Sequence, residues 1–476
     1  MSAQIKFGLP SRRAVAVLGV LPLILSACAN FSGDGGMEPV KKQVSAEIGA
    51  EAKKIASKED AEAAQERVKA LLAQPLTAET AVQVALLNNR GLQARYNFLG
   101  ISEAAFVEAS IPPNPTISIE RIAGTGFVEI DRRLAINLLS LLTLPARKDI
   151  AEKQFRAMQY KTVESTFRVA AETRRLYYKA VAAQQFVRYF EQARLSADAA
   201  ADLTRRLGQT GASSKLAQAR AASFYVEISS RLARARLSAR LQREALTRAL
   251  GVWGADIAYK LPDTLPPLPD ALPNGEEVEV EAITRRVDLM AAKLDLDATA
   301  RALGLTEATR FVSAIDLAGI SRYEKVDGES SYPKGFDIVI QIPIFDLGEV
   351  NVRKANESYM LAVNHFAELA VNIRSEARAA NQTYRAAYDI TREYQNQVLP
   401  LRQIVNEQVL LQYNGMLVDA FELLTTARES IASNAAAIES LRDFYLAEID
   451  YRAAIIGGGA GGFTYESLAS AASGGE

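Results

Sequence analysis

The sequence predicts a mostly α-helical protein with a smaller β part, in which one structural unit occurs twice in tandem. Of its 476 residues, 49% are hydrophobic but only 7% are aromatic. That composition is typical of long, thin helical architecture rather than of a thick globular core. Residues 147–208 and 349–412 contain almost no glycine or proline. Helices of that length would each be on the order of 90 Å long, which favours coiled-coil packing.

Three blocks of similar sequence recur at one constant offset of 204 residues. They are LGISEA (99–104) with LGLTEA (303–308), RRLAINL (132–138) with GFDIVIQI (335–342), and residues 187–211 with 391–415. Because the blocks occur in the same order and at the same spacing, they predict a tandem duplication. In the third block, this offset matches Gly211 with Gly415.

Each copy contains a helix, two strands with alternating apolar residues, a long helix, a tight turn and a returning helix. In the first copy (75–256) the helix is 77–110, the strands are 116–122 and 127–139, and the long helix is 147–208. In the second copy (282–456) they are 282–310, 313–323 and 335–345, and 349–412. Between the copies, 257–281 is predicted to be a proline-rich linker without regular structure, and 457–476 a flexible Gly/Ser-rich tail.

The N-terminus has the pattern of an export signal. Three basic residues precede the apolar run AVAVLGVLPLIL (14–25), which is too short for a resident membrane helix. This predicts a signal peptide over 1–27. The residues LSAC (25–28) resemble the lipobox of bacterial lipoproteins, so Cys28 is expected to be acylated and 28–74 to form a lipidated N-terminal segment. The alternative is an ordinary secretory signal with a chance cysteine.

Four strands per chain are too few to close a β-barrel, for which about eight is the small end of the filled size range. Open strand edges are unfavourable in lipid, so closure requires several copies, and three copies would supply twelve strands. Polar residues that alternate with apolar neighbours would line the lumen of such a barrel. These candidates are Asp131, Arg133, Asp337 and Gln341.

The chain resembles the outer-membrane efflux (TolC) family along nearly its whole mature length. The resemblance rests on PLTAETAVQVALLNNRGLQA (75–94), IPPNP (111–115), YNGMLVDAFELL (413–424) and the duplicated unit. It implies a homotrimer in the cell outer membrane. Its parts would be a 12-stranded transmembrane β-barrel, a long periplasmic coiled-coil α-barrel, and an equatorial region formed by the linker and termini. The N-terminal segment resembles the lipid-anchored branch, which serves pumps for metals or small toxic compounds.

The resemblance also implies roles for the two hairpin turns, as the periplasmic tip where an adaptor protein docks. The matching residues are Arg206, Leu207, Gly211, Asn414, Gly415, Met416 and Leu417. Both glycines are expected to supply the positive φ that a tight turn needs. The alternative is that they only end the helices. Two acids three residues apart, Asp419 and Glu422, match the ring at the constricted periplasmic entrance. The alternative is a solvated face at a helix N-terminus, where acids are favoured by the macrodipole.

Composition and motifs argue against several other classes of function. Net charge is −1, and no basic patch interleaved with aromatic residues is found, so a nucleic-acid partner is not expected. His365 is the only histidine and Cys28 the only cysteine, so neither a metal site nor a cofactor is predicted. No arrangement typical of a catalytic triad or carboxylate pair stands out, so the chain is not expected to be an enzyme.

The leading hypothesis is therefore a passive exit duct, the outer-membrane channel of a tripartite efflux pump. Its partners would be a periplasmic adaptor, an inner-membrane transporter and outer-membrane lipid. One alternative is the exit duct of a type I protein-secretion system, which would share this architecture. Another is a lipid-anchored periplasmic scaffold of helices that forms no pore.

Overall fold

The computed structural model describes residues 31–273, 275 and 277–459 of the chain. The predicted signal peptide, Cys28 and tail residues 460–476 lie outside this part. The described residues divide into two compact units. The first, here called the strand unit, comprises residues 31–36, 98–158 and 291–366. The second, the helix unit, comprises the described residues of 37–97, 159–290 and 367–459.

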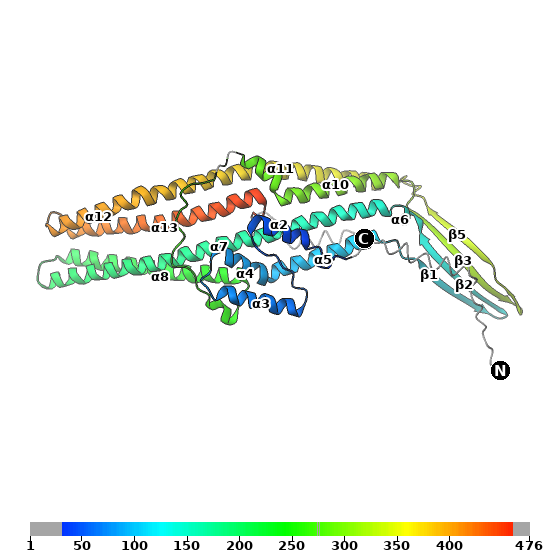
Figure 1. Cartoon of the computed structure of the whole chain (residues 1–476), viewed down its shortest axis with the longest axis horizontal. Helices are drawn as coiled ribbons and strands as arrows, with labels where there is room; N and C mark the ends of the chain where they lie inside the picture. The colour runs from blue at the N-terminus through cyan, green and yellow to red at the C-terminus, as the bar shows by residue number, and fades with distance from the viewer. Residues whose placement is uncertain (1–30, 274, 276, 460–476) are drawn as a thin grey trace, which may run out of the picture. The chain divides into compact units, whose positions relative to one another are not determined.

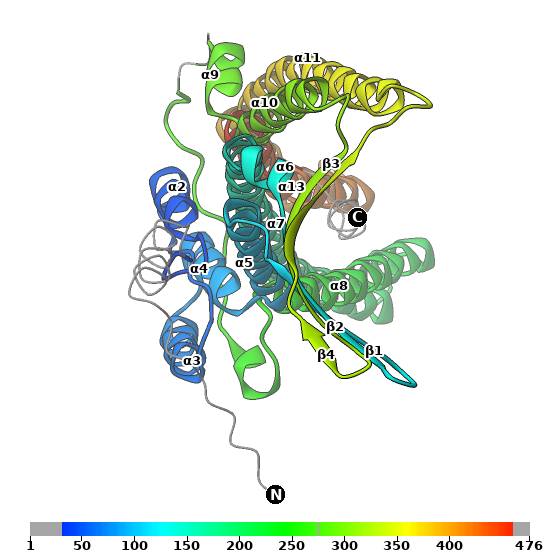
Figure 2. The ribbon, with the colours of Figure 1, turned by 90° about the vertical axis from the view of Figure 1, so that its right-hand side faces the viewer.

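The strand unit contains one antiparallel sheet made by both sequence copies. Its strands are β1 (Thr116–Gly124), β2 (Phe127–Asn137), β3 (Ala314–Val326), β4 (Glu329–Ser331) and β5 (Lys334–Gln341). β1 pairs with β2, β2 with β3, and β3 with β5 (Figure 1). The short β4, labelled in Figure 2, also pairs with β3. The β2–β3 ladder runs from Asn137 opposite Asp316 to Phe127 opposite Val326, and so joins the two copies. Figure 2 shows these strands as a twisted, curved ribbon. The four predicted strands are confirmed.

The last hairpin differs from the prediction at both ends. Asp327 and Gly328 both have positive φ, 49° and 97°, as a two-residue hairpin turn requires. This turn lets β3 continue into the segment expected to be a polar loop and pair with the short β4. The Asp-Gly dipeptide is the sequence signal that was missed. β5 ends at Gln341, four residues earlier than predicted, near Pro343, which has no N–H for a ladder.

Each helix before the strands is broken by one extended residue. The predicted helix 77–110 is α4 (Ala78–Asn88) followed by α5 (Arg90–Ser110), with Asn89 at ψ 111° between them. The predicted helix 282–310 is α9 (Val278–Arg285) followed by α10 (Val287–Ala308), with Arg286 at ψ 119°. The Asn89 side chain accepts a hydrogen bond from the Leu92 backbone N–H at 3.0 Å and so caps α5.

The long helices are present, and the second contains a wider turn. α7 (Leu144–Gln209) has 66 residues and is followed by α8 (Lys215–Leu250). α11 (Glu349–Glu393), the π-helical turn η2 (Tyr394–Val398) and α12 (Leu399–Asn414) follow one another without a break, and α13 (Ala420–Ile456) returns. The N–H of Leu399 bonds to the carbonyl of Tyr394, five residues back. Pro400 has no N–H of its own, which accounts for a local departure from α-helical bonding here.

The remaining helices of the described residues are short. They are α2 (Glu38–Ile48), α3 (Lys58–Leu72), α6 (Leu138–Leu142) and the 3-10 turn η1 (Gly254–Ala258). Among the described residues, none of the helices combines the length and apolarity that a membrane span needs.

The proline-rich linker is anchored although it has little regular structure. Tyr445 of α13 donates a hydrogen bond to the carbonyl of Pro267 at 2.8 Å, and Tyr388 of α11 donates one to Asp270 at 2.8 Å. Gln185 of α7 accepts from the N–H of Leu265, whose side chain is buried. Burial raises the pKa of Tyr445 to about 12, so its hydroxyl stays a donor at neutral pH. The linker therefore ties α7 to α11 and α13 within the helix unit.

Replacing Tyr388→Phe and Tyr445→Phe together should loosen the linker while keeping both rings. Each lost hydrogen bond contributes about 1 kcal/mol, so local opening should become on the order of 30-fold more frequent. Limited proteolysis within 261–275 measures this opening, with the exposed Tyr332→Phe of the strand unit as a control. Equal cleavage rates in the double variant and the wild type would contradict the anchoring.

Candidate functional site

The turn between α7 and α8 is closed by a left-handed residue. Gly211 has φ 78°, and the N–H of Ala212 bonds to the carbonyl of Leu207 at 2.8 Å. The N–H of Gly211 bonds to the carbonyl of Gly208 at 3.2 Å. This pair of bonds is a Schellman motif with Gly211 at the left-handed position. Ser214 then caps α8, because its hydroxyl accepts from the N–H of Ala217 at 3.1 Å.

The turn between α12 and α13 repeats this motif with a different residue at the left-handed position. The N–H of Leu417 bonds to the carbonyl of Gln412 at 2.9 Å, and that of Met416 bonds to Tyr413 at 3.0 Å. Met416 has φ 58°, whereas Gly415 has φ −79°. The expectation that Gly415 supplies the positive φ is therefore wrong. A side chain in this conformation costs about 1 kcal/mol.

The two turns correspond at an offset of 205 residues, not 204. Gly211 corresponds to Met416 as the left-handed residue, and Ser214 corresponds to Asp419 as the N-cap. A π-helical turn bonds residues five apart rather than four, so it holds one residue more than an α-turn. The turn η2 lies in the second copy before the tip and accounts for the extra residue. The predicted match of Gly211 with Gly415 is thus out by one.

Asp419 is the N-cap of α13 in addition to being an exposed acid. One of its carboxylate oxygens, Oδ1, accepts hydrogen bonds from the N–H groups of Phe421 at 3.0 Å and Glu422 at 3.1 Å. Glu422 lies in the first turn of the helix, and its side chain is exposed. The two acids therefore lie together at this helix N-terminus, where the macrodipole also favours them. The cap uses only one of the two carboxylate oxygens, so capping does not exclude a role at an entrance.

The tips present apolar side chains to solvent. Met416 is 93% exposed and Leu417 is 79% exposed. The guanidinium of Arg220 lies over the ring of Phe421, 4.4 Å from its centroid, which links α8 to α13 near the turns. Of the other predicted docking residues, Asn414 is exposed, Leu207 is half-buried, and Arg206 pairs with Asp202 at 2.8 Å.

Below the tips, the two hairpins share a small apolar core. Ala197 of α7, Phe224 of α8 and Leu424 of α13 are buried in one cluster. Arg428 lies over the ring of Phe224 and pairs with Glu227 at 3.2 Å. This packing within the helix unit positions the second turn beside the first hairpin.

In the strand unit, strand pairing brings the predicted lumen residues to one face. Ala318 of β3 is opposite both Ala135 of β2 and Asp337 of β5. Since opposite residues in an antiparallel ladder share a face and alternate residues do too, four side chains lie on one side of the sheet. They are Asp131, Arg133, Asp337 and Gln341. This side is called the polar face below.

Ion pairs cross the strands on the polar face. Arg322 of β3 makes two hydrogen bonds to Asp131, at 2.7 and 2.8 Å, and pairs with Glu129 at 2.7 Å. Arg133 of β2 pairs with Asp337 of β5 at 2.9 Å. Two parallel bonds between a guanidinium and a carboxylate fix both side chains in orientation. These ion pairs order part of the face, which also carries the acids Glu120, Asp316 and Glu324.

The opposite face of the sheet is apolar and uncovered. Phe336 is 77% exposed and Ile117 is 71% exposed, in a single chain. The other members are Ile119, Leu134, Ile338 and Ile340, each at least half exposed. Among the described residues, β1 pairs with β2 alone and β5 with β3 alone, so both outer edges have unpaired backbone groups. Exposed apolar area and free edges on this scale mark a surface that is covered by another molecule.

No metal-binding cluster is present in the part of the chain that the structure describes. Specifically, no group of three or more His, Cys, Asp or Glu side chains is placed to hold an ion there. His365 lies on α11 with an exposed side chain.

Substituting the left-handed residue of each turn should stabilise the second turn and destabilise the first. Met416→Gly removes the strain of a side chain at φ 58°, whereas Gly211→Ala introduces it, by about 1 kcal/mol each. Amide hydrogen exchange should slow several-fold at 415–417 in the first variant and speed up several-fold at 209–213 in the second. Faster exchange in Met416→Gly would show that the side chain stabilises the turn instead.

The cap at Asp419 can be separated from its charge. Asp419→Ala removes the acceptor and should destabilise the first turn of α13 by about 1 kcal/mol, whereas Asp419→Asn keeps an acceptor of similar strength. Hydrogen exchange at 420–424 should therefore rise in the alanine variant and stay near wild type in the asparagine variant. A similar rise in both would mean that charge, not capping, holds this turn.

The chain is similar in structure to several outer-membrane channels. One neighbour is CusC, with 19% identity over 83% of this chain and 92% of that chain and a TM-score of 0.68. Another is a membrane protein from Pseudomonas aeruginosa, with 18% identity, coverage of 82% and 92%, and a TM-score of 0.70. A third is the Campylobacter jejuni CmeC outer-membrane channel, with 16% identity, coverage of 89% and 93%, and a TM-score of 0.62.

No protein-family model and no curated protein sequence matches the chain. The likeness is thus one of three-dimensional structure and extends over most of both chains. The chain therefore has the fold of the TolC-family outer-membrane channels, as the sequence resemblance predicts.

Proposed function

We propose that three copies of this chain form the outer-membrane exit channel of a tripartite efflux pump. The observation that carries the proposal is the sheet, with one polar face, one exposed apolar face and two unpaired edges. Neighbours of the same fold are described as outer-membrane channels, among them OprN and CmeC. The role is passive conduction, with no chemical step assigned to the chain.

Closing the sheet with two further copies removes every free edge. The outer edge of β1 in one copy would pair with that of β5 in the next, which satisfies the backbone groups that lipid cannot. The apolar face would then contact lipid and the polar face would line the lumen. Asp131, Arg133, Asp337 and Gln341 would lie in that lumen. The two aspartates are paired with arginines. The same face also carries Glu120, Glu129, Asp316 and Glu324, so the lining would carry a net negative charge.

The hairpin tips would form the periplasmic end of the duct. Met416 and Leu417 offer apolar contacts for a periplasmic adaptor, which would connect the channel to an inner-membrane transporter. Asp419 and Glu422 from three copies would place six carboxylates around one axis, a ring that favours cations. Acylation of Cys28 would add a lipid anchor. The cargo would be small toxic compounds or metal ions.

Single-channel conductance in planar bilayers tests both the proposed channel and the proposed role of Asp419 and Glu422 at its entrance. The wild type should conduct with cation selectivity. The double variant Asp419→Asn/Glu422→Gln keeps the cap of α13 but removes the charge ring, so its cation selectivity should fall below that of the wild type. Glu62→Gln/Glu66→Gln on α3, two exposed acids away from the tips, serves as the matched control and should behave as wild type.

Each outcome bears on a different part of the proposal. A conducting wild type with an unchanged tip variant would retain the channel and remove the two acids from its entrance. A purified protein that never conducts, with or without the tip substitutions, would contradict the channel and favour the non-conducting scaffold.

A further inference from the structure

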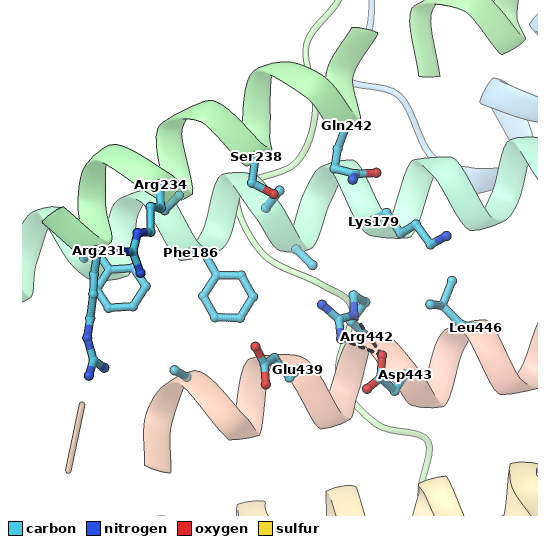
Figure 3. Close-up of a pocket in the computed structure, with 15 residues that line it drawn as sticks. Lys179, Phe186, Arg231, Arg234, Ser238, Gln242, Glu439, Arg442, Asp443 and Leu446 are labelled. Carbon is cyan, nitrogen blue, oxygen red and sulfur yellow. Dashed lines mark hydrogen bonds and ion pairs between the residues drawn. The ribbon is translucent and has the colours of Figure 1, made fainter. Parts of the chain in front are cut away.

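The helix unit contains a pocket that the proposed channel role does not use. It has a volume of about 670 Å³ and lies between α7, α8 and α13 (Figure 3). Its apolar part consists of the rings of Phe186 and Phe190, several alanines and Leu446. Pockets that hold small organic ligands have volumes of about 300–1,000 Å³ and are mainly apolar, with a few fixed polar groups. The pocket has the size and composition of that class.

The pocket is elongated along the helices. Lys179 and Phe186 lie two turns apart on α7, about 10 Å along the axis, and Arg231 and Gln242 on α8 span about 16 Å. Figure 3 shows Arg231 and Arg234 toward one end, Lys179 toward the other, and Phe186 between them. A ligand that fills the pocket would therefore have a flat or elongated apolar body with polar groups at its ends.

The charges around the pocket do not cancel. Arg231 pairs with Glu227 at 2.8 Å, and Arg442 pairs with its neighbour Asp443 at 2.8 Å. Lys179, Arg234 and Glu439 also line the pocket, and in the part of the chain that the structure describes none of these three has an ion-pair partner. Two cations are thus uncompensated against one acid.

Helix α8, which forms one wall of the pocket, adds to this excess of positive charge. α8 carries eight basic and two acidic side chains, a net charge of +6, in a chain whose net charge is −1. A cleft lined by an excess of one sign concentrates its field and raises the local concentration of counter-ions. The potential in the pocket therefore favours anions.

We propose that this pocket binds an amphipathic organic anion. The apolar body would lie against Phe186 and the alanines, and the anionic group would accept charge-assisted hydrogen bonds from Arg234 or Lys179. The apolar wall explains why the ligand is organic rather than inorganic. The uncompensated Glu439 limits the ligand to a small negative charge, because a second anionic group near it would be repelled.

Binding can be measured on purified protein whether or not it conducts, so this proposal and the channel can fail separately. The probe is 2-naphthalenesulfonate, titrated calorimetrically into the protein in nonionic detergent. Its cationic counterpart, trimethyl(2-naphthyl)ammonium, has the same ring system and the opposite charge. The sulfonate should bind saturably, with one site per chain, and more tightly than the ammonium compound.

Substitutions should change the affinity with opposite signs. Lys179→Ala/Arg234→Ala should weaken sulfonate binding at least about tenfold, the loss expected when charge-assisted hydrogen bonds are removed. Glu439→Gln should strengthen it several-fold. Arg240→Ala/Arg248→Ala removes two exposed arginines from the same helix, outside the pocket, and should leave the dissociation constant within about twofold.

Three results would overturn the assignment. The first is tighter binding of the ammonium compound, or weaker sulfonate binding in Glu439→Gln. The second is an equal loss in the control pair, which would show attraction to α8 as a whole rather than to this pocket. The third is an absence of saturable binding in a wild type whose oligomeric state and circular dichroism are normal.

Discussion

Backbone hydrogen bonding at the edges of the sheet is the constraint on which the rest of the structure depends. Each sequence copy contributes one long hairpin, and the β2–β3 ladder joins the hairpins into a single sheet. The chain has no further long strand, among its described residues, to cover the outer edges of β1 and β5. Contact between its exposed apolar face and water is unfavourable in free energy. The proposed ring of copies with lipid outside would satisfy both demands at once.

The duplication is close in topology but not uniform in register. The π-helical turn η2 adds one residue to the second long helix, and every feature of the second tip is displaced by that residue. The left-handed position consequently falls on Met416 instead of a glycine, and the N-cap on Asp419 instead of a serine. The second tip thus differs from the first in strain, in apolar exposure and in charge.

Regular features of the fold were predictable because they leave periodic traces in the sequence. Alternation fixed the four long strands and the sharing of a face by Asp131 and Asp337, and the absence of glycine and proline marked the long helices. The break at Asn89 left no such trace. It depends on hydrogen bonds from Asn88 and Asn89 to the carbonyls of Gly251 and Ala249, about 160 residues away. Sequence patterns report local propensity, so contacts over that separation are beyond them.

The same limit applies to the sites. The turn positions near Gly211 and Gly415 were predictable to within one residue, because helix-ending residues occur there. The constant offset concealed the extra residue, which only the hydrogen-bond pattern of η2 reveals. The linker was expected to lack regular structure, and nothing in its sequence indicated that Tyr388 and Tyr445 bind its carbonyls. The pocket between α7, α8 and α13 combines residues as far apart as Lys179 and Glu439, and no single segment suggests it.

The most direct test of closure by copies is native mass spectrometry of the full chain purified in nonionic detergent. Three chains per particle is the result that closure of the sheet by three copies predicts. A stable monomer would contradict it, because both outer edges of the sheet would then remain without partner strands.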